Sequence, residues 1–397
     1  MKAVVLVAGK GTRMEPLTSG CSKVMLQVAN KPILEHIVNS AIEAGIEGFV
    51  FITGYLDEQI REYFGDGSKW GVSIEYVRQK EQLGTANAIG CAKGYVEGAF
   101  LVLNGDMLIE QEDLKALLSR TEEAVICVKE VENPSDFGVL ETENNRVVRI
   151  IEKPKNPPTN LANAGIYRFR ESIFDFIDRT RESVRNEFEI TDSLQMLIDT
   201  GAAVGYSPLE GRWIDIGYPW DLLKANEYLL KGLRGSCEGI VEPNATIKGE
   251  VVIGKGTLIR NGSYIEGPVI IGENCDIGPN CFIRPSTAIG NHVRVGNAVE
   301  IKNSIIMENT HVGHLSYTGD SVIGRRCNFG AGTKVANLRH DGKNIKVMIK
   351  GRILDSGRRK LGVIMGDDVH TGINTSINIG VIMEKGKCTY PGEIIKQ

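Results

Sequence analysis

The chain of 397 residues is 42% hydrophobic and 24% charged, which is typical of a soluble globular protein with two or three domains. Its formal net charge of −4 gives no overall attraction to nucleic acid or to anionic lipid, so we expect neither as a partner, and any phosphate binding must be local. The eight cysteines never form a CxxC pair, which argues against a zinc site and against a secreted disulfide framework.

The first half of the chain alternates apolar runs with helical patterns. The runs KAVVLV, FVFITG and AFLVLNGD have the length of buried strands, and helical patterns such as KPILEHIVNSAIEAG lie between them. This alternation predicts βαβ units on a largely parallel sheet, whose ligands bind beyond the carboxyl ends of the strands. Later runs such as VICVKEV and NAGIYRF indicate hairpins added to that sheet. The first apolar run is too short for a signal peptide or a membrane span, and we expect a cytoplasmic protein.

A glycine loop, Ala8-Gly9-Lys10-Gly11-Thr12-Arg13, follows the first strand directly. Backbone N–H groups of such a loop can bind phosphate oxygens, and the nearby cations Arg13 and Lys23 can neutralise the phosphate charge. The loop lacks the third glycine of the dinucleotide fingerprint and the GxxxxGK[ST] spacing of a P-loop, so both of those interpretations lose ground. Taken alone, the motif is also compatible with a flexible loop whose cations are solvated.

The stretch LVAGKGTRMEPLT, followed by SKVML, resembles the signature of nucleotidylyltransferases that couple a sugar 1-phosphate to a nucleoside triphosphate and release pyrophosphate. EQLGTANA, NGD, FGV, EKP, NAG and WIDIG match further motifs of this family in the same order. The resemblance implies an α/β fold with a Rossmann-like domain and a mixed sheet over residues 1–232. It implies nucleotide contacts at Leu6, Ala8, Gly9, Gly11, Gln79, Gly84 and Thr85, and sugar-phosphate contacts at Gly138, Glu152 and Asn163.

The same resemblance assigns the charged groups of the reaction. Arg13 would bind the leaving phosphates and Lys23 the attacking or α-phosphate, while Asp106 and Asp215 would hold Mg²⁺ or Mn²⁺ through oxygen ligands. WIDIGYPWDLL is similar to the ending of thymidylyl and glucose uridylyl enzymes, whereas bacterial bifunctional uridylyltransferases have asparagine at the metal position. The sequence therefore leaves open the choice between UTP and dTTP and the identity of the sugar.

The second half of the chain has a six-residue repeat. A helical pattern, WDLLKANEYLLKGL, closes the first half, and the stretch RGSCEG at 234–239 marks the boundary. Every sixth residue is then Val or Ile at Val241, Ile247, Ile253, Ile259, Ile265, Ile271, Ile277, Ile283, Ile289, Val295 and Ile301. This period predicts a parallel β-helix of hexapeptide repeats over 240–397, in which the aliphatic residue points inwards and the next residue, often glycine, takes the left-handed conformation.

The repeat slips twice. The aliphatic position comes one residue early at Ile306 and again at Ile323, with VGHLSYTGD between the two slips. Slips in a repeat redirect side chains, and such places are commonly functional. GHLSYTGD, with FIRPS before it and RRCNFGAG after it, resembles the acetyltransferase half of bifunctional enzymes that acetylate glucosamine 1-phosphate and then uridylylate the product.

This second resemblance implies a left-handed β-helix, a homotrimer, and acetyl-CoA as cosubstrate. It implies His314 as general base, Arg284, Lys302, Tyr317 and Asn328 as substrate contacts, and Asn337 as an acetyl-CoA contact. Imidazole suits the base, because it changes protonation near neutral pH and the amino group must lose a proton to attack a thioester. Residues 338–361 leave the repeat and are rich in Lys and Arg, which predicts either a site for coenzyme A phosphates or a solvated hairpin.

Three hypotheses for the whole chain follow. The leading one is a bifunctional enzyme that makes a nucleotide sugar from UTP or dTTP, a hexosamine 1-phosphate and acetyl-CoA. A narrower one is a monofunctional glucose-1-phosphate thymidylyl- or uridylyltransferase with a structural or regulatory β-helix, which would not need His314. The third is a non-catalytic assembly subunit, as in the eukaryotic initiation-factor exchange complex, which would not need Lys23, Asp106 and Asp215 together.

Overall fold

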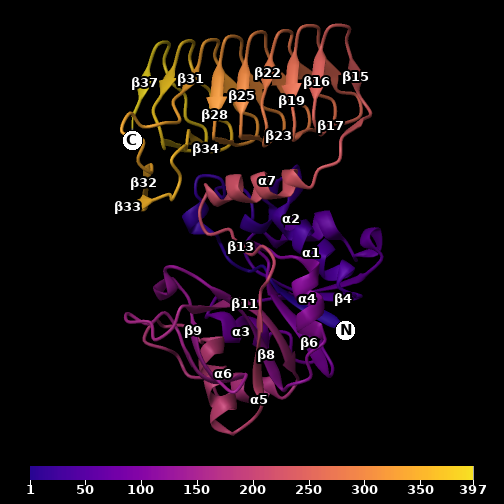
Figure 1. The fold of residues 1–397 in the computed structure, drawn as a ribbon, viewed down its shortest axis with the longest axis vertical. Coiled ribbons are helices and arrows are strands. Elements are labelled where there is room, and N and C mark those ends of the chain that lie inside the picture. The colour runs from indigo at the N-terminus through magenta and orange to yellow at the C-terminus, as the bar shows by residue number, and fades with distance from the viewer. Residues whose placement is uncertain (397) are drawn as a thin grey trace. The chain divides into compact units, whose positions relative to one another are not determined.

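The computed structural model describes residues 1–396 and divides into two compact units (Figure 1). The first unit consists of residues 1–10 and 33–213, and the second of residues 11–32 together with the chain from 214 onwards. These units are groups of residues that pack together, and their bounds differ from those of the domains expected from the sequence. The division into a nucleotidylyltransferase domain at 1–232 and a β-helix domain at 240–397 therefore stays a prediction.

The first unit is built on a nine-stranded mixed sheet. Its strands are β1 (Lys2–Leu6), β4 (Gly48–Thr53), β5 (Ser73–Arg78), β6 (Ala99–Asn104), β8 (Ala124–Glu130), β9 (Val139–Glu143), β10 (Arg146–Ile151), β11 (Leu161–Arg170) and β12 (Val204–Pro208). The main path runs β10-β9-β11-β6-β1-β4-β5, and β8 joins β11 to β12. β1 is parallel to β4 and β6, whereas β11 is antiparallel to β6 and β8. The prediction of a parallel sheet with added hairpins is confirmed.

Helices cover this sheet. They are α1 (Ile33–Glu43), α2 (Asp57–Phe64), α3 (Thr85–Gly90), α4 (Gln111–Leu118), α5 (Ile173–Ile177) and α6 (Ile190–Asp199), with short 3-10 turns η3 (Ser68–Trp70) and η4 (Pro134–Asp136) and the short strand β7 (Met107–Leu108). α6 buries Ile190, Leu194 and Leu197, whose spacing places them on one helical face. Among the described residues, no helix has the length and apolar character that a membrane crossing requires.

The second unit begins with the loop at 11–32 and continues into the β-helix. Before the repeat it contains η1 (Thr12–Met14), η2 (Lys23–Met25), β2 (Gln27–Val28), β3 (Lys31–Pro32), β13 (Ile214–Asp215) and α7 (Asp221–Lys231). The solenoid strands are β14 (Ser236–Cys237), β15 (Ile240–Val241), β16 (Thr246–Lys248), β17 (Val251–Ile253), β18 (Leu258–Ile259), β19 (Tyr264–Glu266), β20 (Val269–Ile271), β21 (Asp276–Ile277), β22 (Phe282–Ile283), β23 (Thr287–Ile289), β24 (Arg294–Val295), β25 (Glu300–Lys302), β26 (Ile305–Ile306), β27 (His311–Val312), β28 (Tyr317–Gly319), β29 (Val322–Ile323), β30 (Asn328–Phe329), β31 (Lys334–Val335), β34 (Ile364–Met365), β35 (Ser376–Ile377), β36 (Ile382–Met383) and β37 (Ile394–Ile395).

These solenoid strands form three parallel sheets, stacked coil on coil (Figure 1). Ile265 pairs with Ile283, which pairs with Ile301, so one column of aliphatic side chains runs along the axis. The architecture is that of a left-handed β-helix, and the predicted fold class is confirmed. Val241 and Ile247 pair with the inward residues Ile259 and Ile265, yet they are 37% and 36% exposed, because they belong to the first coil, which has no neighbouring coil on its outer side.

The left-handed conformation is mostly not at the residue expected. Gly278 has a φ of +108°, as expected, but Gly254, Gly272, Gly290 and Gly296, which also follow an aliphatic position, are not among the positive-φ residues. Glycine occurs there because a Cβ at Gly254 would lie 2.6 Å from the backbone of Gly272 in the next coil. The left-handed residue comes three positions after the aliphatic one, at Asn274, Asn280, Ser286, His292, Ala298, Asn309 and Leu315. Close stacking of the coils therefore explains most of these glycines.

The two slips appear directly in the strand register. Ile253 pairs with Ile271 across an 18-residue coil, whereas Ile306 pairs with Ile323 across one of 17. The shortened corners have left-handed Asn303 and Asp320 only two positions after the inward residue. After Val335 the chain leaves the repeat for the hairpin β32 (Lys346–Ile349) and β33 (Arg352–Asp355), and it re-enters at β34. The basic segment thus forms a hairpin, and the choice between a solvated hairpin and a site for coenzyme A phosphates stays a prediction.

The central aliphatic column should dominate the stability of the β-helix. We expect Ile283→Ala to lower the free energy of unfolding by about 2–5 kcal/mol, because Ile283 is fully buried and alanine would leave a cavity. Ile247→Ala is the matched control, since Ile247 is 36% exposed at the open end and should lose far less. Denaturant unfolding of both variants measures the difference, and equal losses would contradict this account of the core.

Candidate active sites

The loop after β1 packs tightly around Lys23. Gly11 has a φ of +61°, and a Cβ added there would lie 2.7 Å from Cβ of Lys23. Only glycine satisfies both the left-handed conformation and this close approach. Lys23 itself is buried, with 8% of its surface exposed, while the guanidinium of Arg13 is exposed and lies 5.3 Å from the ring centre of Tyr218. Gly11 thus determines the path of the loop that carries the cations Arg13 and Lys23.

Two carboxylates face Arg13 within the second unit. Around Gly217, a Cβ would lie 3.6 Å from Oδ2 of Asp215, 3.8 Å from Oδ2 of Asp221 and 4.0 Å from a terminal nitrogen of Arg13. Asp221 Oδ2 accepts the backbone N–H groups of Gly217 (3.0 Å) and Tyr218 (2.7 Å). Burial raises the pKa of Asp221, against the opposing effect of these N–H groups and of Lys23. Gly217 therefore lies beside groups of opposite charge, two carboxylates and the Arg13 guanidinium.

Asp221 and Tyr218 were missed by the sequence analysis. Both belong to the stretch WIDIGYPWD, and Asp221 is the first residue of α7. An aspartate at that position, four residues after a glycine, is the signal that could have revealed the bond between helix and loop. Asp221 shapes the segment that carries Asp215.

In the first unit, the predicted nucleotide contacts lie at the carboxyl ends of parallel strands. Leu6 ends β1, Gln79 follows β5, and Asp106 follows β6. Gln79 is buried and its Nε2 donates to Oδ1 of Asn87 at 2.7 Å, while Gln82 donates to the carbonyl of Ala8. The edge of the sheet where these strands end is the place at which such folds bind ligands.

The start of α3 is held against a distant segment of the chain. A Cβ at Gly84, where φ is +114°, would lie 2.5 Å from the carbonyl oxygen of Phe188. Thr85 Oγ1 accepts the N–H of Ile190 at 3.0 Å, and the N–H of Phe188 donates to the carbonyl of Leu83 at 2.7 Å. The predicted nucleotide contacts Gly84 and Thr85 are therefore held by the segment that leads into α6.

Three of the predicted sugar-phosphate residues meet in one cluster. A Cβ at Gly138 would lie 3.1 Å from Oε2 of Glu152 and 3.5 Å from Cβ of Asn163. Asn163 donates to the Tyr167 hydroxyl at 2.8 Å. Gly138 thus leaves room that any side chain would fill, with a carboxylate and an amide at its border. The structure brings these predicted residues together.

Arg185 joins this cluster and was not predicted. Its guanidinium lies 3.0 Å from Glu152 and 3.3 Å from Glu189, and it is one of the residues that line a cavity of about 490 Å³. Glu189 is 3% exposed, and burial together with the nearby Glu152 raises the pKa of Glu189. The segment RNEFEIT contains these charges, but its spacing alone does not show that they converge on Glu152.

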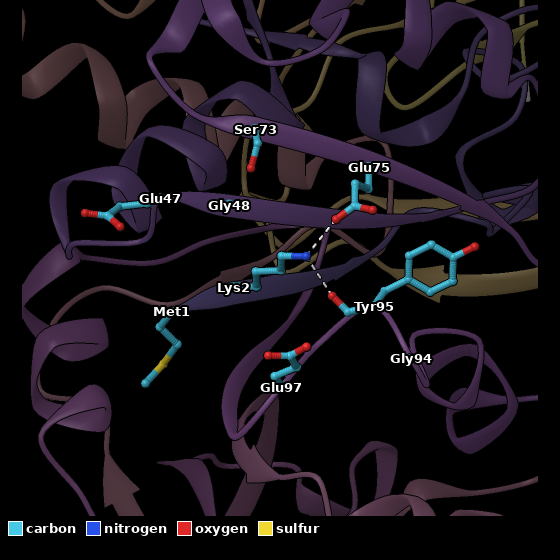
Figure 2. Close-up of a pocket in the computed structure, with 9 residues that line it drawn as sticks. All are labelled: Met1, Lys2, Glu47, Gly48, Ser73, Glu75, Gly94, Tyr95 and Glu97. Carbon is cyan, nitrogen blue, oxygen red and sulfur yellow. Dashed lines mark hydrogen bonds and ion pairs between the residues drawn. The ribbon is translucent and has the colours of Figure 1, made fainter.

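A second cavity, of about 550 Å³, lies at the opposite ends of the strands (Figure 2). Lys2 Nζ donates to Glu75 Oε1 at 2.7 Å and to the carbonyl of Tyr95 at 2.8 Å, and Glu47 and Glu97 lie nearby (Figure 2). None of the predicted site residues lines this cavity.

In the β-helix, a buried carboxylate gathers three of the predicted acetyl-transfer residues. Asp320, 2% exposed, accepts hydrogen bonds from Lys302 Nζ (3.1 Å) and Asn337 Nδ2 (2.6 Å). Asn337 Nδ2 also lies 3.1 Å from the Tyr317 hydroxyl. The register that pairs Lys302 with Gly319 sets Tyr317 one coil above Lys302. The second short corner therefore brings Asp320 between the residues that the resemblance implied.

Asp320 and its neighbour Asn303 were missed. Asn303 Nδ2 donates to Asp320 Oδ1 at 2.8 Å and to Glu227 of α7 at 2.9 Å. The slips in the repeat could have pointed to them, because Asn303 and Asp320 are the left-handed residues of the two shortened corners. Burial raises the pKa of Tyr317, and its hydrogen bond to Asn337 opposes that shift.

The remaining predicted residues of the β-helix have other partners. Arg284 pairs with Glu300 at 2.9 Å, and Asn328 stands in register with His311. His314 is exposed, and its Nδ1 accepts the N–H of Asn297 at 3.1 Å. A neutral ring in this arrangement has its proton on Nε2, so His314 must release the Asn297 bond before that ring can accept a proton.

Comparison with known proteins places the chain in a family. Residues 2–232 match the family model described as nucleotidyl transferase. The chain belongs to the nucleotidyl transferase family. In this family member, residues 265–389 also match the model described as the GMPPB C-terminal domain.

Two relatives match nearly the whole chain. The protein named bifunctional protein GlmU of Methanocaldococcus jannaschii is 46% identical over 383 residues, covering 96% of this chain and 91% of the relative. A protein of Sulfurisphaera tokodaii named bifunctional sugar-1-phosphate nucleotidylyltransferase/acetyltransferase is 41% identical over 401 residues, covering 100% and 98%. The likeness therefore extends through both halves.

Solved structures match the first half. A structure from Bacillus anthracis described as a glucose-1-phosphate thymidylyltransferase in complex with sucrose is 29% identical, with a TM-score of 0.54, and covers 60% of this chain and 98% of that one. A UDP-glucose pyrophosphorylase complexed with UDP-glucose is 26% identical, with a TM-score of 0.53, covering 58% and 98%. This nucleotidyl transferase family member therefore has the fold of sugar nucleotidylyltransferases in its first half.

Proposed function

We propose that the chain is a bifunctional enzyme of nucleotide-sugar synthesis. It acetylates glucosamine 1-phosphate with acetyl-CoA and then transfers a uridylyl or thymidylyl group from UTP or dTTP to the N-acetylated sugar phosphate. The observation that carries the proposal is the cluster of Lys302, Tyr317 and Asn337 around buried Asp320, because a purely structural β-helix does not need it. Relatives that match both halves are named as bifunctional enzymes, which supports the same conclusion.

In nucleotidyl transfer, a phosphate oxygen of the sugar 1-phosphate attacks the α-phosphorus of the nucleotide. The new P–O bond forms as the bond from the α-phosphorus to the bridging oxygen breaks, and pyrophosphate leaves with the electron pair. Exposed Arg13 binds the leaving phosphates, and buried Lys23 holds the α-phosphate or the attacking one. No proton transfer is needed, because the attacking group is already an anion.

The residues proposed to bind metal fit a hard divalent ion. Asp106 and Asp215 offer carboxylate oxygens, and within residues 1–396 no group of three or more His, Cys, Asp or Glu could hold a metal by itself. Mg²⁺ is commonly bound by one or two carboxylates together with substrate phosphates. Bound in that way, Mg²⁺ or Mn²⁺ would neutralise phosphate charge during the reaction.

In acetyl transfer, the neutral amino group of glucosamine 1-phosphate attacks the thioester carbonyl carbon, and His314 takes one N–H proton from the nitrogen as the C–N bond forms. The C–S bond then breaks, the thiolate leaves with the electron pair, and it receives that proton from His314. Lys302, held by Asp320, and Arg284 supply positive charge for the sugar phosphate. We propose that Asn337 and the basic hairpin at 346–355 contact acetyl-CoA, and that the enzyme works as a homotrimer in the cytoplasm.

Two assays on the wild-type protein test the proposal. We expect pyrophosphate release from UTP or dTTP with N-acetylglucosamine 1-phosphate, and release of the CoA thiol from acetyl-CoA with glucosamine 1-phosphate. Glucose and galactosamine 1-phosphates in the same panel define the sugar preference. Absence of thiol release with every amino sugar would leave the monofunctional alternative, and absence of pyrophosphate release with every sugar phosphate would refute the enzyme proposal.

Asp320 should position Lys302 and Asn337 for acetyl transfer. We expect Asp320→Asn to lower kcat/KM for thiol release about 10- to 100-fold, mainly through KM for the sugar phosphate, because an amide cannot accept all three hydrogen bonds now directed at the carboxylate. Pyrophosphate release should stay unchanged. Asp276→Asn is the matched control, since Asp276 pairs with Arg260 on an earlier coil at the surface. Equal effects of the two variants would refute the positioning role.

A further inference from the structure

The loop that carries Arg13 and Lys23 packs with the β-helix. Residues 11–32 belong to the same compact unit as the solenoid, although they follow β1 directly in sequence. Two groups of contacts fasten the loop to the coils, one at residues 16–21 and one at residues 29–30. Lys23 lies between them, so its position depends on both.

The first group of contacts centres on Arg325. Its guanidinium lies beside the Cys21 thiol and forms an ion pair with Glu308, with Nε 2.6 Å from Oε1. Cys21 is 1% exposed and the Arg325 side chain 17% exposed, so the contact is largely shielded from water. Pro16 touches the coil at Gly366, where a Cβ would lie 3.0 Å from Cβ of Pro16. Arg325 is thus a partly buried cation at the point where loop and solenoid meet.

The second group of contacts holds the end of the loop through backbone groups. Asn30 Nδ2 donates to the carbonyl of Ile289 at 2.6 Å. Asn226 of α7, fully buried, accepts the N–H of Ala29 and donates to the carbonyl of Ser286, both at 2.9 Å. These bonds fix residues 29 and 30 after Lys23, whereas the Cys21–Arg325 contact lies two residues before it.

A shift of the loop at Cys21 would reach the proposed catalytic cations directly. Lys23 is two residues after Cys21, and its Cβ is packed against Gly11, two residues before Arg13. A displacement of about 1 Å in a phosphate-binding group can cost on the order of 100-fold in rate. A change at the contact between Cys21 and Arg325 of the β-helix would therefore be passed on to Lys23.

We infer that Arg325, a residue of the β-helix, is a positioning residue for nucleotidyl transfer. It acts by holding Cys21, and through Cys21 the position of Lys23 and of the loop that carries Arg13. The inference rests on the proposed nucleotidyl transfer activity and adds that this activity requires the solenoid. Arg325 and the neighbouring Arg326 differ in this respect, because Arg326 is exposed and pairs with Asp368 at 2.7 Å.

The test compares Arg325→Met, Arg325→Lys and Cys21→Ala with the matched control Arg326→Met in the full chain. Steady-state pyrophosphate release with UTP gives kcat and KM, thiol release gives the second activity of the same samples, and thermal unfolding reports whether each variant is folded.

We expect Arg325→Met to lower kcat for pyrophosphate release at least 10-fold and to leave thiol release within twofold of the wild type. Arg325→Lys should restore part of this loss, because it restores the charge beside Glu308 and Cys21. Cys21→Ala, which leaves every β-helix side chain in place, should show a smaller loss of the same kind, and Arg326→Met none.

The outcomes separate the inference from the proposed function. Pyrophosphate release within twofold of wild type in both Arg325→Met and Cys21→Ala would overturn the inference. So would a parallel fall of both activities with a lowered unfolding temperature, which would show a general structural role. Wild-type protein that releases no pyrophosphate would instead refute the proposed function, and the inference with it.

Discussion

Replacing His314 with alanine is expected to abolish acetyl transfer and to spare nucleotidyl transfer. The expected fall in kcat for thiol release is about 10²- to 10⁴-fold, which is the usual contribution of a positioned general base. The methyl group of alanine cannot accept the proton that the attacking amine must lose. His314 is exposed at a corner of the β-helix, so its removal leaves no cavity in the core.

The readouts for this variant are thiol release and pyrophosphate release from the same sample. His292→Asn is the control, because His292 is another exposed corner residue of the β-helix and asparagine tolerates its left-handed conformation. If His314→Ala released thiol at the normal rate, His314 would not be the base. A concurrent loss of pyrophosphate release would show that the two proposed sites do not act independently.

The bond between Asn297 and His314 adds a condition to this role. Because Nδ1 of His314 accepts the Asn297 N–H, the ring must turn or exchange its proton between nitrogens before it can act as a base. A Cβ at Gly296 would lie 2.8 Å from Nδ1 of His314, so glycine at this position also provides the space in which the ring stands. The geometry thus describes a resting arrangement from which the catalytic one has to be reached.

The β-helix was readable from the sequence because one physical constraint repeats. Each coil needs an aliphatic residue at the same inward position, and the register from Ile265 through Ile283 to Ile301 shows that constraint satisfied. The glycines were assigned to the wrong cause, since close contact between coils and a demand for positive φ select the same residue. Only the coordinates distinguish them, as at Gly254.

The candidate site residues were predictable where they belong to motifs, and not where they act through tertiary contacts. The spacing of Lys302, Tyr317 and Asn337 is visible in the sequence, but the role of Asp320 is not, because its partners Lys302 and Asn337 come from the coils on either side of it. The same holds for Arg325 and Cys21, which are separated by some 300 positions. Local pattern carries no information about such a pair.

Replacing Asp106 with asparagine is expected to abolish nucleotidyl transfer and to spare acetyl transfer. An amide is a weaker ligand than a carboxylate for a hard divalent ion, and the loss of metal stabilisation is worth several kcal/mol in the transition state. At 1.36 kcal/mol for each factor of ten, the fall in kcat for pyrophosphate release should be at least about 100-fold. Residual activity should require a higher Mg²⁺ concentration than the wild type.

Asp175→Asn, on the exposed side of α5, is the control for this variant and should change neither activity. Unchanged Mg²⁺ dependence in the Asp106 variant would remove Asp106 from the metal site. Loss of both activities would point instead to a folding defect, which thermal unfolding would reveal. Because thiol release needs no metal in the proposed mechanism, it serves as the internal reference that separates a lost ligand from a lost fold.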